Sequence, residues 1–137
     1  MGFDFSAEER GFIFVVGHPE LGSVARNGAS YAHAEGNSTQ ALGEASHSEG
    51  KDTQATGNYS HASGLGTIAS AEAQTVVGKY NQVDPEAVFI IGNGDSKIDE
   101  ETGETNITRN NLFTIKTDGT VYAGTKNLTN PTIDNTI

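Results

Sequence analysis

The chain has 137 residues, of which 18 are acidic and 8 basic, and its formal net charge is -10. It contains 17 glycines and no cysteine, which excludes a disulfide framework and a thiolate metal site. The acidic field disfavours nucleic acid as a partner, and no apolar run approaches the roughly 20 residues that cross a bilayer. We predict neither nucleic-acid binding nor membrane insertion.

Residues 1–21 are predicted to form an N-terminal capping segment for the repeats that follow. Ser6 and Glu9 have the spacing of a capping box and predict one helical turn. The apolar run at 12–16 predicts a buried strand, after which Pro19 turns the chain into a first, irregular coil. No basic segment followed by an apolar run opens the chain, so no export signal is expected.

Residues 22–80 contain a sequence repeat, which decides the fold class. Between Ser30 and Gly78, every unit of seven ends in glycine except one, which ends in Ala71. The repeated glycines are Gly36, Gly43, Gly50, Gly57, Gly64 and Gly78. In the first five units, histidine and glutamine alternate at the fourth position, so the full period is fourteen residues.

A period of seven is typical of coiled coils, but this composition argues against a helix. Each glycine in a helix interior would cost about 1 kcal/mol relative to alanine. A coiled coil also needs two bulky apolar residues in each heptad, whereas the most regular column here holds mainly alanine. The helical alternative is therefore excluded.

A short strand closed by a tight corner fits every unit of seven. Alternation places the third and fifth residues of a unit on one face and the fourth on the other. The glycines are predicted to take the corners, where the backbone needs φ > 0. The inward residues are then all small: Ala32, Ala34, Thr39, Ala41, Ser46, Ser48, Thr53, Ala55, Ser60, Ala62, Thr67 and Ala69. Two strands and two corners per fourteen residues predict one coil of a flattened parallel β-solenoid.

The predicted coils are too poor in apolar bulk to fold alone. The repeat gives about three and a half coils, spaced about 4.8 Å apart, and few of its side chains are large and apolar. Their burial would not offset backbone ordering, which costs about 1 to 2 kcal/mol per residue. We therefore expect association, most simply as a homotrimer about a long axis.

The alternation of Ser-His-Ala-Glu-Gly and Thr-Gln-Ala-x-Gly segments resembles a known family. Such fourteen-residue repeats occur in the heads of trimeric autotransporter adhesins, and the version with histidine is similar to repeats of phage tail fibres. The resemblance covers roughly residues 22–80 and implies a left-handed parallel β-roll with three chains side by side. Segments 77–81, 88–94 and 111–123 resemble the block that follows such rolls in phage fibres. The chain shows no coiled-coil stalk or membrane anchor, which favours the virion over the adhesins.

Residues 81–124 are predicted to form a small β-rich domain. The apolar run at 88–91 predicts a buried strand and the glycines at 92–94 predict a turn. Segment 95–105 is predicted to be an acidic, exposed loop. Calcium is disfavoured there, because Lys97 stands where an EF-hand loop needs an oxygen ligand.

A β-hairpin is the strongest short-range signal after the repeat. Asp118 and Gly119 separate apolar runs at 112–116 and 121–123, and Asp-Gly favours a type I′ turn. Residues 125–137 have no periodicity and are predicted to be an irregular tail.

Three histidines, His33, His47 and His61, recur at the fourteen-residue period and should form a stacked ladder with about 4.8 Å per step. A linear ladder does not converge on one ion, as zinc requires, so no metal and no cofactor are predicted. Acid would charge the ladder and loosen any assembly that buries it.

Glu35 and Glu49 occupy one column of the repeat, and paired carboxylates are the working groups of glycoside hydrolysis. Solubility explains a repeated exposed glutamate equally well, and the column breaks at Ser63. No phosphate loop, nucleophile elbow or zinc-finger spacing occurs. We therefore predict that the protein is not an enzyme.

Repeat and resemblance together predict a structural fibre segment of a phage tail or tail-like particle, located in the virion. It would serve as a rigid spacer and as a host-attachment module for a cell-surface glycan or protein. Two alternatives stay open: the head domain of a bacterial trimeric adhesin at the cell surface, and a glycan-cleaving tail spike.

Overall fold

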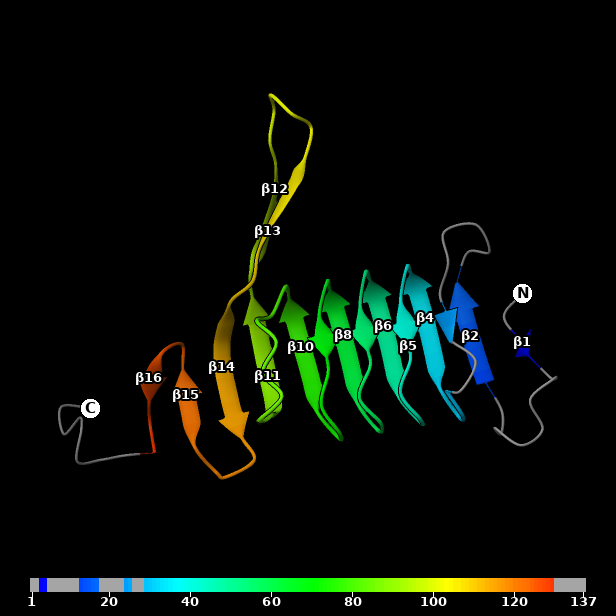
Figure 1. Ribbon diagram of the computed structural model, residues 1–137, viewed down its shortest axis with the longest axis horizontal. Coiled ribbons are helices and arrows are strands. Elements are labelled where there is room, and N and C mark those ends of the chain that lie inside the picture. Colours follow the sequence, from blue (N-terminus) through cyan, green and yellow to red (C-terminus); the bar gives the residue numbers. More distant parts are fainter. Residues whose placement is uncertain (1–2, 5–12, 18–23, 26–28, 130–137) are drawn as a thin grey trace.

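The computed structural model describes residues 3–4, 13–17, 24–25 and 29–129, and in these ranges the chain is all-β with no helix. The largest sheet has ten strands that follow one another along the molecule (Figure 1). In spatial order they are β1 (Phe3–Asp4), β2 (Ile13–Gly17), β4 (His33–Asn37), β6 (His47–Lys51), β8 (His61–Leu65), β10 (Thr75–Lys79), β11 (Ala87–Asn93), β14 (Asn111–Lys116), β15 (Val121–Ala123) and β16 (Lys126–Asn127). A second sheet has four strands: β3 (Val24–Ala25), β5 (Gln40–Ala41), β7 (Gln54–Ala55) and β9 (Ile68–Ala69). Among the described residues, no helix suited to crossing a membrane is found.

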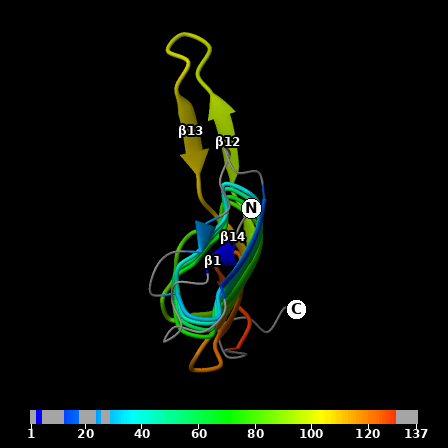
Figure 2. The same ribbon diagram turned by 90° about the vertical axis from the view of Figure 1, so that its right-hand side faces the viewer.

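The two sheets form a parallel β-solenoid of about 4 turns, which confirms the architecture predicted from the repeat. Each repeat contributes one long strand to the large sheet and one short strand to the small sheet. Strands of successive coils pair in parallel with a shift of fourteen residues, so His33 lies opposite His47 and Gln40 opposite Gln54. Seen along the stack, the coils superpose as a narrow loop (Figure 2).

Small side chains fill the space between the two sheets. All twelve residues predicted to point inward are at most 1% exposed, which confirms the predicted alternation. Their hydroxyl groups find partners inside the coil, except that of Thr39. Ser48 Oγ and Thr53 Oγ1 lie 2.7 Å apart, and Ser60 Oγ donates to the carbonyl of Gly57 at 2.6 Å. The coil can therefore be thin because nothing bulky separates its sheets.

The glycine column confirms the predicted φ > 0 at four of its six positions, but not their placement at corners. These four, Gly36, Gly50, Gly64 and Gly78, lie inside long strands and have φ between 96° and 115°. Gly43 and Gly57 lie at bends ahead of a turn. A Cβ atom on Gly43 would approach the carbonyl oxygen of Gly57, in the next coil, to 2.1 Å. Glycine is needed because successive backbones touch at this column, and Ala71 is tolerated in the last coil, where it is partly exposed.

The corners instead use a second column, in which the backbone is left-handed at residues that are mostly not glycine. Seven of them have φ between 41° and 61°: Tyr31, Ser38, Ala45, Asp52, Tyr59, Ala73 and Tyr80. Such a conformation costs an L-residue about 1 to 2 kcal/mol. Hydrogen bonds between coils offset this strain, since Tyr59 N donates to Glu44 O at 2.7 Å. Gly66, which lies outside the glycine column, takes the same corner position with φ 61°.

Two buried amides close the C-terminal end of the solenoid. The large sheet continues through β11, whose Phe89 pairs with Thr75, whereas the small sheet ends at β9. Asn81 replaces the missing neighbour of β9, because its Oδ1 accepts from Ile68 N at 2.8 Å and its Nδ2 donates to Ile68 O at 3.0 Å. Gln74 acts similarly, with Oε1 accepting from Ser70 N at 2.9 Å. Both amides take third positions of the repeat, where Ala, Ser or Thr stands in the other coils.

Replacing Asn81 with alanine should destabilise the fold by about 2 kcal/mol or more. The substitution leaves the backbone N–H and C=O of Ile68 without partners, and a buried unpaired polar group costs about 1 to 3 kcal/mol. Urea unfolding of Asn81→Ala measures the effect, with Gln82→Ala as the control because the Gln82 side chain is exposed. Equal unfolding midpoints for the two variants would contradict the capping role.

Segment 95–108 forms a projecting hairpin, where a turn at 92–94 and a loop at 95–105 were predicted (Figure 1). Strand β12 (Asp95–Ile98) pairs antiparallel with β13 (Thr105–Thr108), and Gly92 belongs to β11. The prediction of a loop was wrong because backbone pairing holds these strands although their side chains are largely exposed. Ile98 is 70% exposed.

Strands β14 and β15 form the predicted hairpin, but its turn is not of type I′. That turn needs two residues with positive φ, and only Gly119, at 92°, has one. Gly119 N donates to Lys116 O at 3.1 Å, and Lys116 N donates to Thr120 O at 2.8 Å, which closes a longer loop. The carboxylate of Asp118 holds this loop by accepting from Thr120 N at 2.8 Å.

Of the N-terminal predictions, the strand expected at 12–16 is found at 13–17 as β2. The helical turn predicted from Ser6 to Glu9 and the turn at Pro19 lie outside the described residues.

Candidate functional site

The three histidines form a stack on the outer face of the large sheet. They open β4, β6 and β8, and their side chains point away from the small-residue core. The ring centroids of His33 and His47 are 4.6 Å apart with 4° between the ring planes, and those of His47 and His61 are 4.6 Å apart with 7°. The parallel register of the strands sets this spacing.

Two carboxylates stand beside the stack, and we call the five residues His33, Glu35, His47, Glu49 and His61 the His–Glu ladder. Each glutamate lies two residues after a histidine, so alternation puts both on one face. Glu35 lies 3.7 Å from His33 Nε2 and 3.8 Å from His47 Nε2. Glu49 lies 4.0 Å from His47 Nε2 and 3.3 Å from His61 Nε2. The sequence prediction treated the two columns separately and missed this contact, although the spacing of two signalled it.

The middle of the ladder disfavours positive charge on His47. Burial lowers the pKa of His47, as do the neighbouring His61 and His33, although Glu49 and Glu35 act in the opposite direction. Its Nε2 atom is buried and makes no hydrogen bond. His47 is therefore a neutral imidazole held between two carboxylates.

Stability should fall when the pH drops from about 7.5 to about 5.5 in the presence of a chelator. The pKa of His47 in the folded state lies below its ordinary 6.5, so just below pH 6.5 the unfolded chain binds more protons than the folded one. The folded state therefore keeps its full stability above pH 6.5, where His47 is neutral in both states, and loses stability as the pH falls below 6.5. His47→Gln should show a shallower decrease in thermal unfolding midpoint over this range. A variant slope equal to wild type would contradict the assignment.

Glu35 and Glu49 are the paired carboxyl groups that a glycan-cleaving function would use, and Glu49 does not suit the role of general acid. A hydrogen bond with the carboxyl of Glu35 lowers the pKa of Glu49, and the Ser63 hydroxyl and the imidazoles of His47 and His61 add to this. A general acid in glycoside hydrolysis needs a raised pKa. The ladder therefore holds Glu49 as a carboxylate, which suits charge pairing or metal binding.

A second feature of the outer face is a group of apolar side chains, here called the apolar face. It consists of Val77, Phe89, Ile91, Phe113, Ile115 and Val121, each partly exposed. Cross-strand pairing joins them, since Phe89 lies opposite Ile115, and Ile91 opposite both Val77 and Phe113. The apolar face continues the surface of the large sheet that carries the His–Glu ladder.

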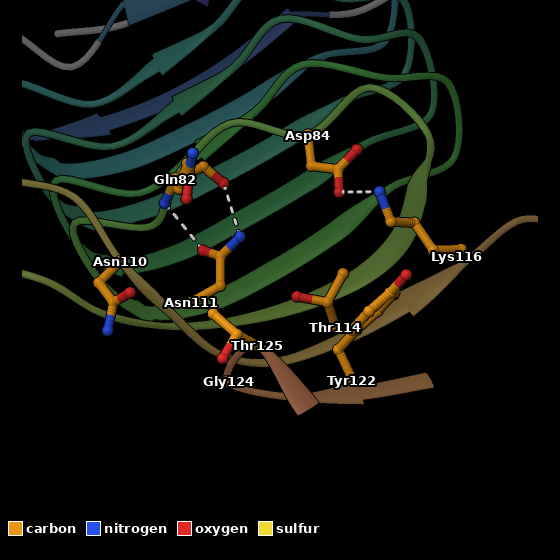
Figure 3. A pocket seen from close by; sticks show the side chains of 9 residues that line it. All are labelled: Gln82, Asp84, Asn110, Asn111, Thr114, Lys116, Tyr122, Gly124 and Thr125. Atoms are coloured by element: carbon orange, nitrogen blue, oxygen red, sulfur yellow. Dashed lines mark hydrogen bonds and ion pairs between the residues drawn. The ribbon is translucent and has the colours of Figure 1, made fainter. Parts of the chain in front are cut away.

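A polar pocket of about 210 Å³ lies at the C-terminal end of the solenoid (Figure 3). Its polar groups bond mainly to each other: Asn111 Nδ2 donates to Gln82 O at 2.9 Å, and Lys116 Nζ lies 2.5 Å from Asp84 Oδ2. The hydrogen bond to Asp84 raises the pKa of Lys116. Nine residues line the pocket: Gln82, Asp84, Asn110, Asn111, Thr114, Lys116, Tyr122, Gly124 and Thr125.

These three features, the ladder, the apolar face and the polar pocket, are the candidate sites of the described chain. Of the three, the ladder is the one whose side chains are imidazoles and carboxylates, which bind protons and metal ions. These side chains also point outward from the regular strands of the large sheet. Comparisons with protein-family models, with curated proteins and with solved structures find no match to this chain.

Proposed function

We propose that the chain is a segment of a homotrimeric fibre of a phage tail or tail-like particle, where it acts as a rigid spacer and host-attachment module. The apolar face is the observation that supports this most. Its six side chains lie on the outer surface of a solenoid whose own core is made of Ala, Ser and Thr. Two further copies of the chain, packed around a common axis, would cover these side chains in each subunit.

The chemistry of the surface also supports a fibre rather than a catalyst. Cross-coil hydrogen bonds and stacked glycines give a regular rod, and the net charge of -10 per chain keeps such a rod soluble. At the corners of the coils, Tyr31 and Tyr59 are 62% and 53% exposed. Aromatic rings with a polar tip are common in recognition surfaces, so these corners are candidate contacts to a host glycan or protein.

Native mass spectrometry and cell adsorption together test the proposal. A particle of three 14.4-kDa chains that adsorbs to bacterial cells supports it, and Tyr31→Ala with Tyr59→Ala should reduce adsorption without changing the mass. A monomer at micromolar concentration would refute the trimeric fibre. Falling viscosity of host capsule during incubation would instead favour a glycan-cleaving spike, and an export signal in the full gene would favour a bacterial adhesin.

A further inference from the structure

We propose that His47, Glu49 and His61 form a binding site for a divalent transition-metal cation of the zinc type. One ligand atom from each residue lies within 4.8 Å of the others, and all three residues are partly buried. The expectation against a metal considered the imidazoles alone, which stack in a line. Glu49 changes the geometry because its carboxylate stands beside the line and faces both rings.

The distances in the ladder bring its ligand atoms close to the positions needed to share one ion. Zinc binds imidazole nitrogen and carboxylate oxygen at about 2.1 Å in a tetrahedron, which places two ligand atoms about 3.4 Å apart. The separation of His61 Nε2 from Glu49 Oε1 is 3.3 Å, and that of His47 Nε2 from Glu49 Oε2 is 4.0 Å. The first pair fits as it stands, and the second requires a rotation of the side chains. The two imidazoles must also tilt toward each other, because their rings are stacked with centroids 4.6 Å apart and 7° between the planes.

The hydrogen bonding of His47 and the charge of Glu49 favour the binding of a cation. The Nε2 atom of His47 is buried without a hydrogen-bond partner, and such an atom is normally satisfied by a proton donor or a metal. Glu49 is held as a carboxylate and supplies negative charge.

The donor set selects the class of metal. Two imidazole nitrogens and one carboxylate oxygen suit zinc and its late first-row neighbours, with water completing the shell. Calcium and magnesium prefer oxygen ligands and should bind poorly. Among the described residues one such group of ligands is found, so we expect one ion per chain.

Zinc titration of the full chain by isothermal calorimetry tests the site. Wild-type protein should bind one Zn²⁺ per chain, and Ca²⁺ at the same concentration should give no heat. His47→Gln and Glu49→Gln should each weaken zinc binding at least about tenfold, since even outer-shell partners of a metal are worth about 10- to 100-fold. Glu44→Gln removes a carboxylate from an exposed position outside the ladder and should bind like wild type.

Two outcomes would overturn the site: no zinc binding by the wild-type chain up to millimolar concentration, or binding that both ladder variants retain. Circular dichroism of each variant establishes that the fold is intact, and Glu49→Gln is the milder change should His47→Gln lose structure. The site lies within one chain, so it is independent of the proposed trimer. Native mass measured on the same samples separates failure of the site from failure of the assembly.

Discussion

Gly43→Ala is expected to destabilise the protein by at least about 3 kcal/mol, a loss large enough to threaten folding. Its Cβ atom would lie 2.1 Å from Gly57 O, 2.4 Å from Gly57 C and 2.8 Å from Asn58 N. All three are backbone atoms of the next coil, so no side chain can move aside. The coils would have to separate, which breaks the inter-coil hydrogen bonds such as Gly43 N to Ala55 O. Urea unfolding followed by circular dichroism measures the loss.

The control for this substitution is Gly119→Ala, which separates crowding from backbone strain. Gly119 has φ 92° and nothing within 4 Å of an added Cβ, so alanine there should cost only about 1 to 2 kcal/mol from its left-handed conformation. Gly43 lies outside the left-handed region, so its cost comes from crowding alone. If both variants unfold at the same urea concentration, contact between coils is not the reason for the glycine column.

Ile91→Asp is expected to convert the proposed trimer into monomers. Ile91 lies within the apolar face, between Val77 on β10 and Phe113 on β14. In the trimer the substitution would bring three carboxylates out of water, at a cost of several kcal/mol each. In the single chain the side chain is partly exposed, so the substitution removes no fully buried contact of the chain's own core. Sedimentation velocity with circular dichroism distinguishes dissociation from unfolding.

Gln54→Asp provides a matched control, because it adds the same charge on the outer face of the small sheet. Gln54 is partly exposed on β7, away from the apolar face. This variant should sediment like wild type. Should Ile91→Asp remain trimeric while Gln54→Asp dissociates, the small sheet rather than the large one would form the interface.

The inward residues could be predicted because alternation along a strand is a local rule. Ala34, Ser48 and Ala62 differ in chemistry but share a position, and the structure buries each of them. The reason for the glycines could be predicted only in part. Positive φ was expected and is found at strand glycines such as Gly36, but the close approach of successive backbones, which is the sole reason at Gly43, appears only in the structure. The left-handed corners could not be predicted either. Residues as different as Tyr31 and Asp52 occupy the same corner position, so no single residue type marks it in the sequence.

The stack of histidines in the candidate site could be predicted from the sequence, but the contacts between these histidines and the glutamates were not predicted. The period of fourteen places His47 against His61, but the prediction did not combine that register with the spacing of two between His47 and Glu49. The caps had a signal too: Gln74 and Asn81 interrupt a column of small residues. Interpreting that break as a cap requires knowing that β9 is the last strand of its sheet, which depends on the path of the chain after Tyr80.

The terminal amides make the length of this rod easy to change. Gln74 and Asn81 contact only the last coil and the strand after it, so the coils before them are equivalent building blocks. An in-frame duplication of one block would lengthen the rod by about 4.8 Å and leave both ends as they are. The length of such a protein can therefore change during evolution by duplication or loss of whole fourteen-residue units. The residues that cap its C-terminal end need not change.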